Sequence, residues 1–436
     1  MKKKLLATLL AVALMATSLV GCGGKDDEGS KDSGNAGNTT NDGGSSNTGD
    51  TTPSGEKEDV TLVMWGAEEH QTMLRTMADE FIAAYADQAN ITVELGVQSE
   101  AGTKDTILTD PTAAADVFAF ADDQINELVA NKCLQPVVEN TDAIIAANSA
   151  ASIDAATVDG TLYAYPMTAS NGYFMYYNKE YFTEEDVKTL DGMIAAAEAA
   201  GKQISMTVND GWYIYSFFAG AGLTVGLEAD GVTNYCTWNA TDTAITGVDV
   251  ANALLDICAK PGFAVLSDAE FATGVKDGSI IAGVNGTWNA TTAQDAWGDN
   301  YAAVKLPTYT VAGQQAQMCS FAGFKLVGVS AYSEQPYWAM MLAEWITNET
   351  NQATRFDLTG EGPSNVNIAA TDKVLSAPAI AALASQASYA TAQRVGGNYW
   401  SPAQTFGQNM ADGNPNGEDL QTLLDTMVEG ITAPVQ

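Results

Sequence analysis

Aromatic residues and carboxylates stand close together at several points of the chain. Trp212 follows Asp210 by two positions, and Asp123 follows Phe120 by three. A ring can cover the C–H face of a pyranose, while a carboxylate accepts hydrogen bonds from its hydroxyl groups. These residue types therefore suit a neutral ligand with polar edges and apolar faces. The complete candidate set is Trp65, Glu68, Glu69, Phe120, Asp123, Asp210, Trp212, Trp288 and Trp400.

The expected order of elements places two of these groups at the ends of strands. Residues 60–65 and 116–120 are apolar runs of strand length, and residues 73–85 show helical spacing between them. Strands that alternate with helices predict βαβ units and a mainly parallel sheet, which binds ligands beyond the carboxyl ends of its strands. Trp65 and Phe120 lie at such ends, where an aromatic ring either contacts a ligand or is buried in the hydrophobic core.

The tryptophans differ in their surroundings. Trp212 and Trp288 stand in turns rich in glycine, asparagine and aspartate, where a core ring is less expected than a ligand contact. The remaining tryptophans lack this context and are predicted to be structural: Trp238, Trp297, Trp338 and Trp345.

Charge and cysteine usage exclude several classes of function. The formal net charge of −35 repels nucleic-acid phosphates and anionic lipid headgroups, so neither is an expected partner. The single histidine, His70, is predicted to lie exposed at a helix start. Four scattered cysteines form no metal-binding spacing and are predicted to be free, buried thiols, so no metal or cofactor is expected: Cys133, Cys236, Cys258 and Cys319.

The N-terminus predicts export and anchoring. Residues 1–22 combine three lysines, an apolar segment too short for an ordinary membrane span, and a final Leu-Val-Gly-Cys that looks like a bacterial lipobox. Cys22 would then be acylated, which places the protein on the outer face of the cytoplasmic membrane with the lipid as its only membrane contact. Residues 23–59 are too polar to fold and are predicted to be a disordered tether.

The stretch 160–182 organises the rest of the chain. Pro166 and the small polar residues after it would interrupt a central strand, so the stretch is predicted to be a crossover between two domains. It contains the motifs LYAYP and YYNKEYF. These resemble the crossover between lobes in the maltodextrin-binding type of extracellular solute-binding proteins, which serve ABC sugar importers.

The resemblance implies an α/β, two-lobed periplasmic-binding-protein fold. Each lobe would be a mainly parallel sheet flanked by helices, and three hinge crossings would join the lobes. Phe321–Phe324 resembles the second crossing and Gly360–Asn365 the third. The lobes implied are residues 60–166 with 324–364, and residues 167–323 with 365–436.

The same resemblance implies the site and the function. The positions that match the family's sugar site are Phe120, Asp123, Asp210, Trp212 and Trp400. The motif NGTW, which ends at Trp288, is close to the family's NGPW. The implied protein is a monomer that captures an oligosaccharide, above all a maltooligosaccharide or related α-glucan, and delivers it to an ABC permease.

Some positions depart from the family's pattern, so the resemblance does not determine which sugar is bound. Ser170-Asn171 stand where the family has a glutamate, Gln124 replaces a basic residue, and Glu68, Glu69 and His70 replace the basic residues of the first loop. The alternatives are another oligosaccharide on the same fold and a surface lipoprotein that binds or hydrolyses glycans. No phosphate loop or serine–histidine arrangement supports catalysis, so the chain is predicted not to be an enzyme.

Overall fold

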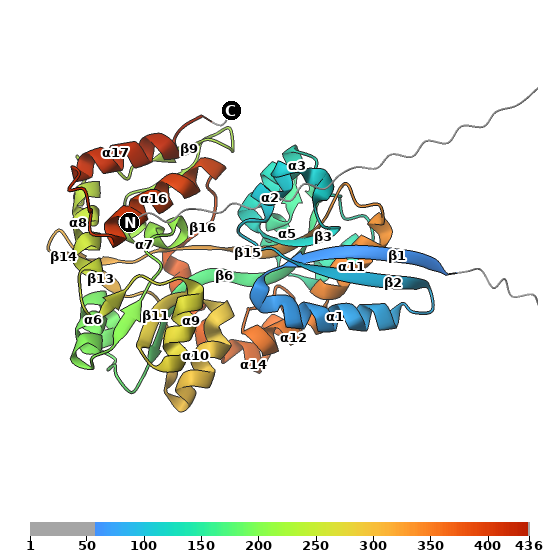
Figure 1. The fold of residues 1–436 in the computed structure, drawn as a ribbon, viewed down its shortest axis with the longest axis horizontal. Helices are drawn as coiled ribbons and strands as arrows, with labels where there is room; N and C mark the ends of the chain where they lie inside the picture. The colour runs from blue at the N-terminus through green and yellow to red at the C-terminus, as the bar shows by residue number, and fades with distance from the viewer. Residues whose placement is uncertain (1–56, 435–436) are drawn as a thin grey trace, which may run out of the picture. The chain divides into compact units, whose positions relative to one another are not determined.

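The computed structural model describes residues 57–434. The chain forms a two-lobed α/β fold with one sheet that runs through both lobes (Figure 1). The strand order is β10-β7-β11-β6-β15-β3-β1-β2, with β12 (Tyr301–Val304) beside β6 and β16 (Ala390–Ala392) beside β15. Across these residues, no helix has the length and apolar character needed to cross a membrane. The predictions for residues 1–22, including Cys22, and for most of the tether lie outside the described residues.

Three parallel strands form the outer sheet of the N-terminal lobe: β2 (Ala89–Val97), β1 (Glu58–Gly66) and β3 (Val117–Ala121). Along β1, alternate residues such as Leu62 and Met64 are buried, so one face of the sheet builds what we call the N-terminal core. The strand begins inside the predicted tether because Glu58 and Asp59 already pair with β2.

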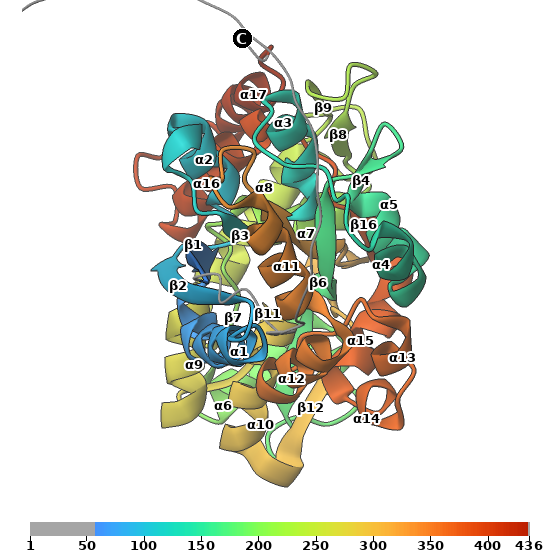
Figure 2. The same cartoon turned by 90° about the vertical axis from the view of Figure 1, so that its right-hand side faces the viewer.

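Helices cover this lobe. The helices α1 (Gln71–Ala84), α11 (Pro336–Thr347) and α12 (Glu349–Thr359) lie side by side (Figures 1 and 2). Met73, Met77 and Phe81 of α1 recur at helical spacing and are buried in the N-terminal core. The two shorter helices α2 (Thr103–Thr109) and α3 (Ile125–Ala130) flank β3 in sequence.

The C-terminal lobe repeats this construction around three parallel strands: β10 (Phe263–Ala264), β7 (Gln203–Ser205) and β11 (Ile280–Gly286). One face packs on a large group of helices and forms the C-terminal core: α6 (Leu190–Ala199), α7 (Gly211–Gly220), α8 (Gly247–Cys258), α16 (Trp400–Ala411) and α17 (Leu420–Ile431). The other face packs on α9 (Asp268–Asp277), α10 (Ala290–Trp297) and α15 (Pro378–Gln386).

Two strands run through both lobes. They are β6 (Ala164–Asn178) and β15 (Ser320–Val329), which pair antiparallel with each other and with strands of either lobe. The first predicted crossover is therefore a strand, and the sheet is parallel only in its outer parts. The third crossing, Gly360–Asn365, touches the first through a bridge between Thr168 and Pro363.

The expected interruption at Pro166 is wrong as local structure. Residues 164–178 form one continuous strand in which Pro166 pairs with Leu326 of β15. The pairing register shifts on either side of Lys325, so irregular pairing accommodates a residue that has no N–H to donate. Tertiary pairing has overridden the local preference.

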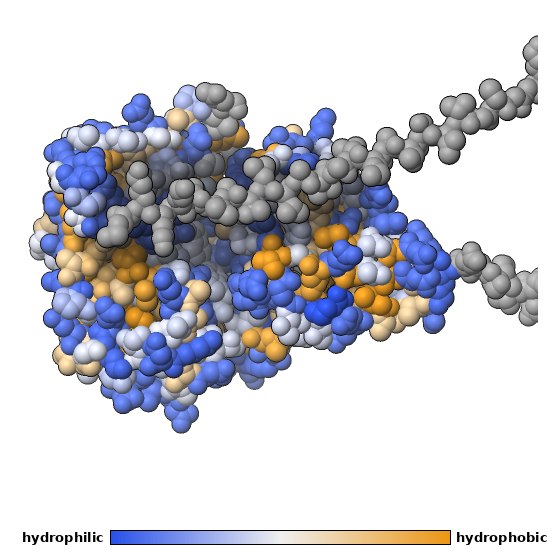
Figure 3. All heavy atoms as spheres, in the orientation of Figure 1, coloured by the Kyte–Doolittle hydropathy of each residue, from blue (hydrophilic) through white to orange (hydrophobic). Residues whose placement is uncertain are grey.

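The four cysteines of the described chain are free, as predicted. Cys133 is buried, as predicted. The prediction of full burial is wrong for three others, which are only half-buried: Cys236, Cys258 and Cys319. Burial still raises the pKa of the Cys236 and Cys258 thiols to about 12, which keeps them protonated and unreactive at neutral pH. Hydrophilic residues cover most of the face shown in Figure 3, in agreement with the excess of acidic side chains.

Candidate ligand-binding site

Two predicted tryptophans of the C-terminal lobe lie next to each other. Trp212 stands at the start of α7, where Asp210 caps the helix by accepting a 2.7 Å hydrogen bond from its backbone N–H. Trp288 lies in the short 3₁₀ helix Thr287–Asn289 that follows β11. The ring centroids are 5.7 Å apart with planes inclined by 33°, and both residues are half-buried. The two turns therefore supply one partly exposed aromatic surface.

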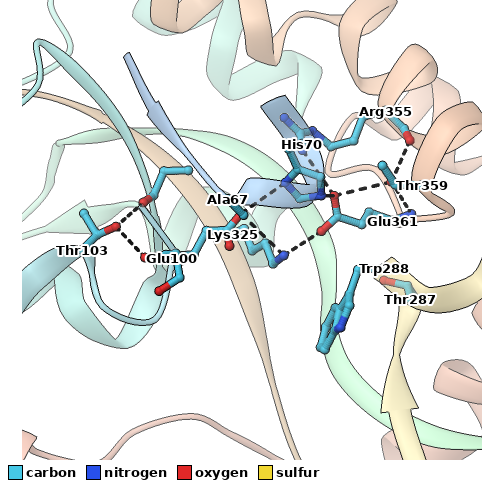
Figure 4. Close-up of polar contacts among 12 residues, drawn as sticks. Ala67, His70, Glu100, Thr103, Thr287, Trp288, Lys325, Arg355, Thr359 and Glu361 are labelled. Atoms are coloured by element: carbon cyan, nitrogen blue, oxygen red, sulfur yellow. Dashed lines mark hydrogen bonds and ion pairs between the residues drawn. The ribbon is translucent and has the colours of Figure 1, made fainter. Parts of the chain in front are cut away.

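The orientation of Trp288 is fixed from several sides. A Cβ added at Gly286 would lie 2.0 Å from two ring carbons, so the ring packs on the glycine backbone. Its Nε1 donates to Asp268 Oδ2 at 3.0 Å. The Lys325 Nζ lies 5.1 Å from the ring centroid, within the range of a cation–π contact (Figure 4). Because Lys325 belongs to the crossing strand β15, the hinge region touches the ring directly.

Asp268 is a functional candidate that the sequence did not reveal. Besides Trp288, its carboxylate accepts hydrogen bonds from the Tyr213 hydroxyl at 3.1 Å and from Asn285 Nδ2 at 3.0 Å. Asp268 is the first residue of α9 and lies inside the Ser267–Glu270 capping box, a pattern that indicates only a helix start. Burial raises the pKa of Asp210, and the nearby charge of Asp268 adds to this.

Two adjacent aspartates follow β3 in the N-terminal lobe. Asp122 is buried and accepts hydrogen bonds from the Phe324 N–H at 2.9 Å and from Arg394 Nη1 at 2.7 Å. Burial raises the pKa of Asp122, although Arg394 opposes the shift. Burial and the charge of Asp122 together raise the pKa of the Asp123 carboxyl to about 7, against the opposing effects of Gln393 and Lys104.

Gln393 binds one of the two tryptophans. Its Oε1 accepts a 2.7 Å hydrogen bond from Trp212 Nε1. Gln393 and Arg394 follow the short strand β16 (Ala390–Ala392). A three-residue strand is too short to give a detectable sequence pattern, so both residues were missed.

The remaining candidates are more dispersed. Phe120 is fully buried in the N-terminal core and leaves no ring face for a ligand, so we exclude it from the proposed site. Trp65 is half-buried with its indole over Gly96, and Glu68 and Glu69 are exposed in the 3₁₀ helix Glu68–His70. Trp400 is half-buried at the start of α16. It packs on Tyr399 beside Gly211, the neighbour of Trp212.

The expectation that His70 is exposed is wrong. His70 is 2% exposed, with Nδ1 at 3.5 Å from a Glu100 carboxylate oxygen and Nε2 at 3.3 Å from one of Glu361 (Figure 4). Glu361 also pairs with Lys325 at 2.7 Å and with Arg355 at 3.2 Å. Four separate chain segments, at residues 70, 100, 325 and 355–361, bring these charges together, which local sequence patterns do not report.

The buried charges perturb one another strongly. Burial acts to raise the pKa of Glu100, but Lys325 and His70 outweigh it and lower the value to about 2. Burial also acts to raise the pKa of Glu361, but Lys325, His70 and Arg355 together hold it well below its usual range. Burial acts to lower the pKa of Lys325, but Glu100 and Glu361 outweigh it and raise that value. Both carboxylates and the ammonium group are therefore ionised at neutral pH, and Lys325 presents a full positive charge to Trp288.

Comparisons with known proteins agree with this architecture. A family model described as bacterial extracellular solute-binding protein matches residues 80–382. The galactooligosaccharide-binding protein of Bacillus subtilis (strain 168) is 25% identical over 455 aligned positions, which cover 98% of this chain and 96% of that protein.

Solved structures give the same picture. A protein whose structure was determined with acarbose is 29% identical, with a TM-score of 0.73 over 87% of this chain and 99% of that chain. The maltodextrin-binding protein MalE1 from L. casei BL23, solved without ligand, is 25% identical, with a TM-score of 0.66 over 86% of this chain and 99% of that chain.

Proposed function

The chain belongs to the family of bacterial extracellular solute-binding proteins, and from this premise we propose that it captures an oligosaccharide between its two lobes. The observation that carries the proposal is the pairing of Trp212 with Trp288 beside carboxylates. Rings at this spacing can cover the C–H faces of a sugar, while Asp123 and Asp210 accept hydrogen bonds from its hydroxyl groups. The family and the relatives found are binding proteins, in agreement with the expectation that the chain is not an enzyme.

We propose a maltooligosaccharide or related α-glucan as the ligand, because a maltodextrin-binding protein is among the structural relatives. A galactooligosaccharide is the second candidate, because a relative aligned over nearly the whole chain is named for that sugar. Both ligands offer the stacked C–H faces and hydroxyl edges that the aromatic and acidic residues suit.

The proposed mechanism is ligand-stabilised closure. The lobes correspond to residues 60–166 with 324–364 and to residues 167–323 with 365–436, an assignment supported by the separate N-terminal and C-terminal cores. A sugar that touches both lobes binds the closed form more tightly, so it shifts the equilibrium between open and closed forms about the three crossings. An ABC permease would recognise the closed form and receive the sugar.

The proposal also covers the cellular location of the protein and its oligomeric state. Acylation of Cys22 would hold the protein on the outer face of the cytoplasmic membrane, with residues 23–57 as the tether. The protein would act as a monomer, since one chain supplies both lobes of the site. The alternative from a different class is a surface lipoprotein that binds glycans without delivering them to a permease.

Isothermal titration calorimetry with maltose to maltoheptaose, galactooligosaccharides and β-linked glucans tests the proposal. The sugars are analysed by chromatography after each titration. Saturable binding of intact maltooligosaccharides supports the first ligand, and binding of galactooligosaccharides alone selects the second. Cleavage of any sugar, or no binding across the whole panel, contradicts oligosaccharide capture.

A further inference from the structure

Lys325 contacts Trp288 across the boundary between the lobes. Lys325 belongs to the N-terminal lobe, because the next residue of β15, Leu326, is buried in the N-terminal core. Trp288 belongs to the C-terminal lobe, where it follows β11 and donates to Asp268 at the start of α9. The Lys325 Nζ lies 5.1 Å from the centroid of the ring (Figure 4). The proposed stacking ring is therefore contacted from the opposite lobe.

Buried charges fix the position of this ammonium group. Lys325 is 7% exposed, and its Nζ lies 2.7 Å from Glu361 Oε1 and 3.7 Å from Glu100 Oε1. Glu361 is itself paired with Arg355 at 3.2 Å, and His70 lies within 3.5 Å of both glutamates. A lysine side chain has a flexible four-carbon stem, so an unpaired ammonium group would sample many positions. Here the carboxylates hold it beside the indole, and a desolvated cation–π contact is stronger than an exposed one.

The turn that carries Trp288 is also tied to the first and third crossings. The Ser170 Oγ accepts a 2.6 Å hydrogen bond from the Gly362 N–H and lies 3.0 Å from Thr287 Oγ1. Ser170 and Thr287 are both buried. The backbone of the turn is therefore fixed at the hinge, which leaves the direction of the Trp288 ring to its side-chain contacts.

The contacts on the ring differ in the lobe from which they come. Asp268 and Gly286 belong to the C-terminal lobe, so they would hold the ring in the same way whether the lobes are open or closed. Lys325 directly follows the second crossing, so its place beside the ring depends on the angle between the lobes. The cation therefore links the orientation of the proposed sugar platform to the hinge.

We propose that Lys325 is a positioning residue that holds the Trp288 ring, from the N-terminal lobe, in the orientation that stacks on a sugar. The inference rests on the proposed function, which makes this ring a sugar platform. How firmly the ring is held is a property of the ligand-free protein, so it can be measured without a ligand.

The test compares the full wild-type chain with the double variant Lys325→Met and Glu361→Gln. Methionine keeps most of the length of the lysine stem and removes the charge beside the ring. Glutamine removes the negative charge that would otherwise stay buried without its partner, so the sum of the buried charges does not change. The matched control is Lys373→Met with Asp357→Asn, because it neutralises an exposed ion pair in the same way.

The first measurement is ligand-free. It is the order parameter of the Trp288 indole N–H, whose signal is assigned by its loss in Trp288→Phe. This order parameter should fall from about 0.85, typical of a rigid group, to below about 0.6 in the double variant. The Trp345 indole, which donates to the Met77 carbonyl within the N-terminal lobe, should keep its order and so exclude a general loosening of that lobe. The control should change neither signal.

The second measurement is the Kd for maltotetraose. The double variant should raise it by about 2- to 10-fold, as expected when an aromatic contact weakens, and the control should leave it unchanged. A folded double variant overturns the inference if the order parameter of Trp288 or the Kd stays at the wild-type value, or if Trp345 loses as much order as Trp288. If wild type binds no sugar, the proposed function fails while the order parameters still decide the role of Lys325.

The contact can also be measured in the wild-type protein. Nuclear Overhauser effects between the Lys325 Hε protons and the Trp288 ring protons should be present without ligand. If the double variant does not fold, their presence supports the inference and their absence overturns it.

Discussion

Replacing Gly286 by alanine should displace Trp288 without removing it. The backbone at Gly286 is extended, with φ of −95°, so alanine is tolerated by the main chain. The new Cβ would lie 2.0 Å from two ring carbons, whereas carbon atoms in contact are ordinarily about 3.5–4.0 Å apart. The ring therefore has to retreat by roughly 1.5 Å. Such a shift stretches the 3.0 Å hydrogen bond to Asp268 and moves the proposed stacking surface.

The expected cost follows from these contacts. The hydrogen bond to Asp268 lies within the protein and affects its stability, whereas affinity falls because the displaced ring stacks less well on the sugar. An aromatic contact contributes about 0.5–1.5 kcal/mol, so Kd should rise by about 2- to 10-fold. Calorimetric titration with the best oligosaccharide of the panel measures the change, and the indole N–H spectrum reports the Trp288 environment. Circular dichroism confirms that the variant is folded.

The matched control is Gly102→Ala. Its Cβ would meet only the ends of the flexible Gln98 and Ser99 side chains, at 3.0 and 3.2 Å, so binding should not change. If Gly286→Ala binds with the wild-type Kd and leaves the Trp288 signal in place, the ring is not held as described and the reasoning is refuted. A loss of affinity no larger than that of the control would refute it as well.

Four further outcomes are expected. Trp288→Ala should weaken sugar binding by ~1–3 kcal/mol because it removes an aromatic platform, as measured by calorimetry. Affinity should rise as pH increases through about 7, because a sugar hydroxyl donates to the ionised carboxylate of Asp123, and Asp123→Asn should flatten this dependence. Glu361→Gln should lower the free energy of unfolding in urea by roughly 3–5 kcal/mol, because it leaves the buried charge of Lys325 without its nearest partner. Cys22→Ser should abolish incorporation of labelled fatty acid in cells.

Each of these expectations has a contrary result. Wild-type affinity in Trp288→Ala would remove that ring from the site. A pH profile that Asp123→Asn leaves unchanged would assign the titration to another group. Full stability of Glu361→Gln would mean that Lys325 finds another counter-charge, and persistent acylation of Cys22→Ser would exclude Cys22 as the anchor.

The sequence was informative where local patterns determine structure. Trp212 and Trp288 were singled out by the glycine, asparagine and aspartate residues around them, and the structure places the two rings side by side. The two-lobed fold was predicted from the sequence motifs of the crossover, and not from the periodicity of hydrophobic residues. Phe120 shows where local patterns fail, because an aromatic at a strand end reads the same whether it faces a ligand or the core.

The features that were missed depend on contacts between distant segments. Nothing near His70 indicates that Glu100 and Glu361 will converge on it, so an isolated histidine at a helix start looked exposed. Pro166 was judged by its local preference, whereas the register shifts of the opposite strand decide its conformation. Gln393 carries no sequence pattern of its own, since its side chain bonds to Trp212, which lies 181 positions earlier in the chain.

The shared strands have a consequence for how the chain acquires its structure. Phe324 donates to the carboxylate of Asp122, 202 positions earlier, and β15 supplies the neighbour of β3 in the N-terminal lobe. That lobe therefore cannot complete its sheet until the ribosome has passed residue 329. Sheets that pair residues so far apart in sequence fold slowly, because a long loop has to close before any contact forms. Slow completion of this sheet would leave time for export before folding, which suits a member of an extracellular family.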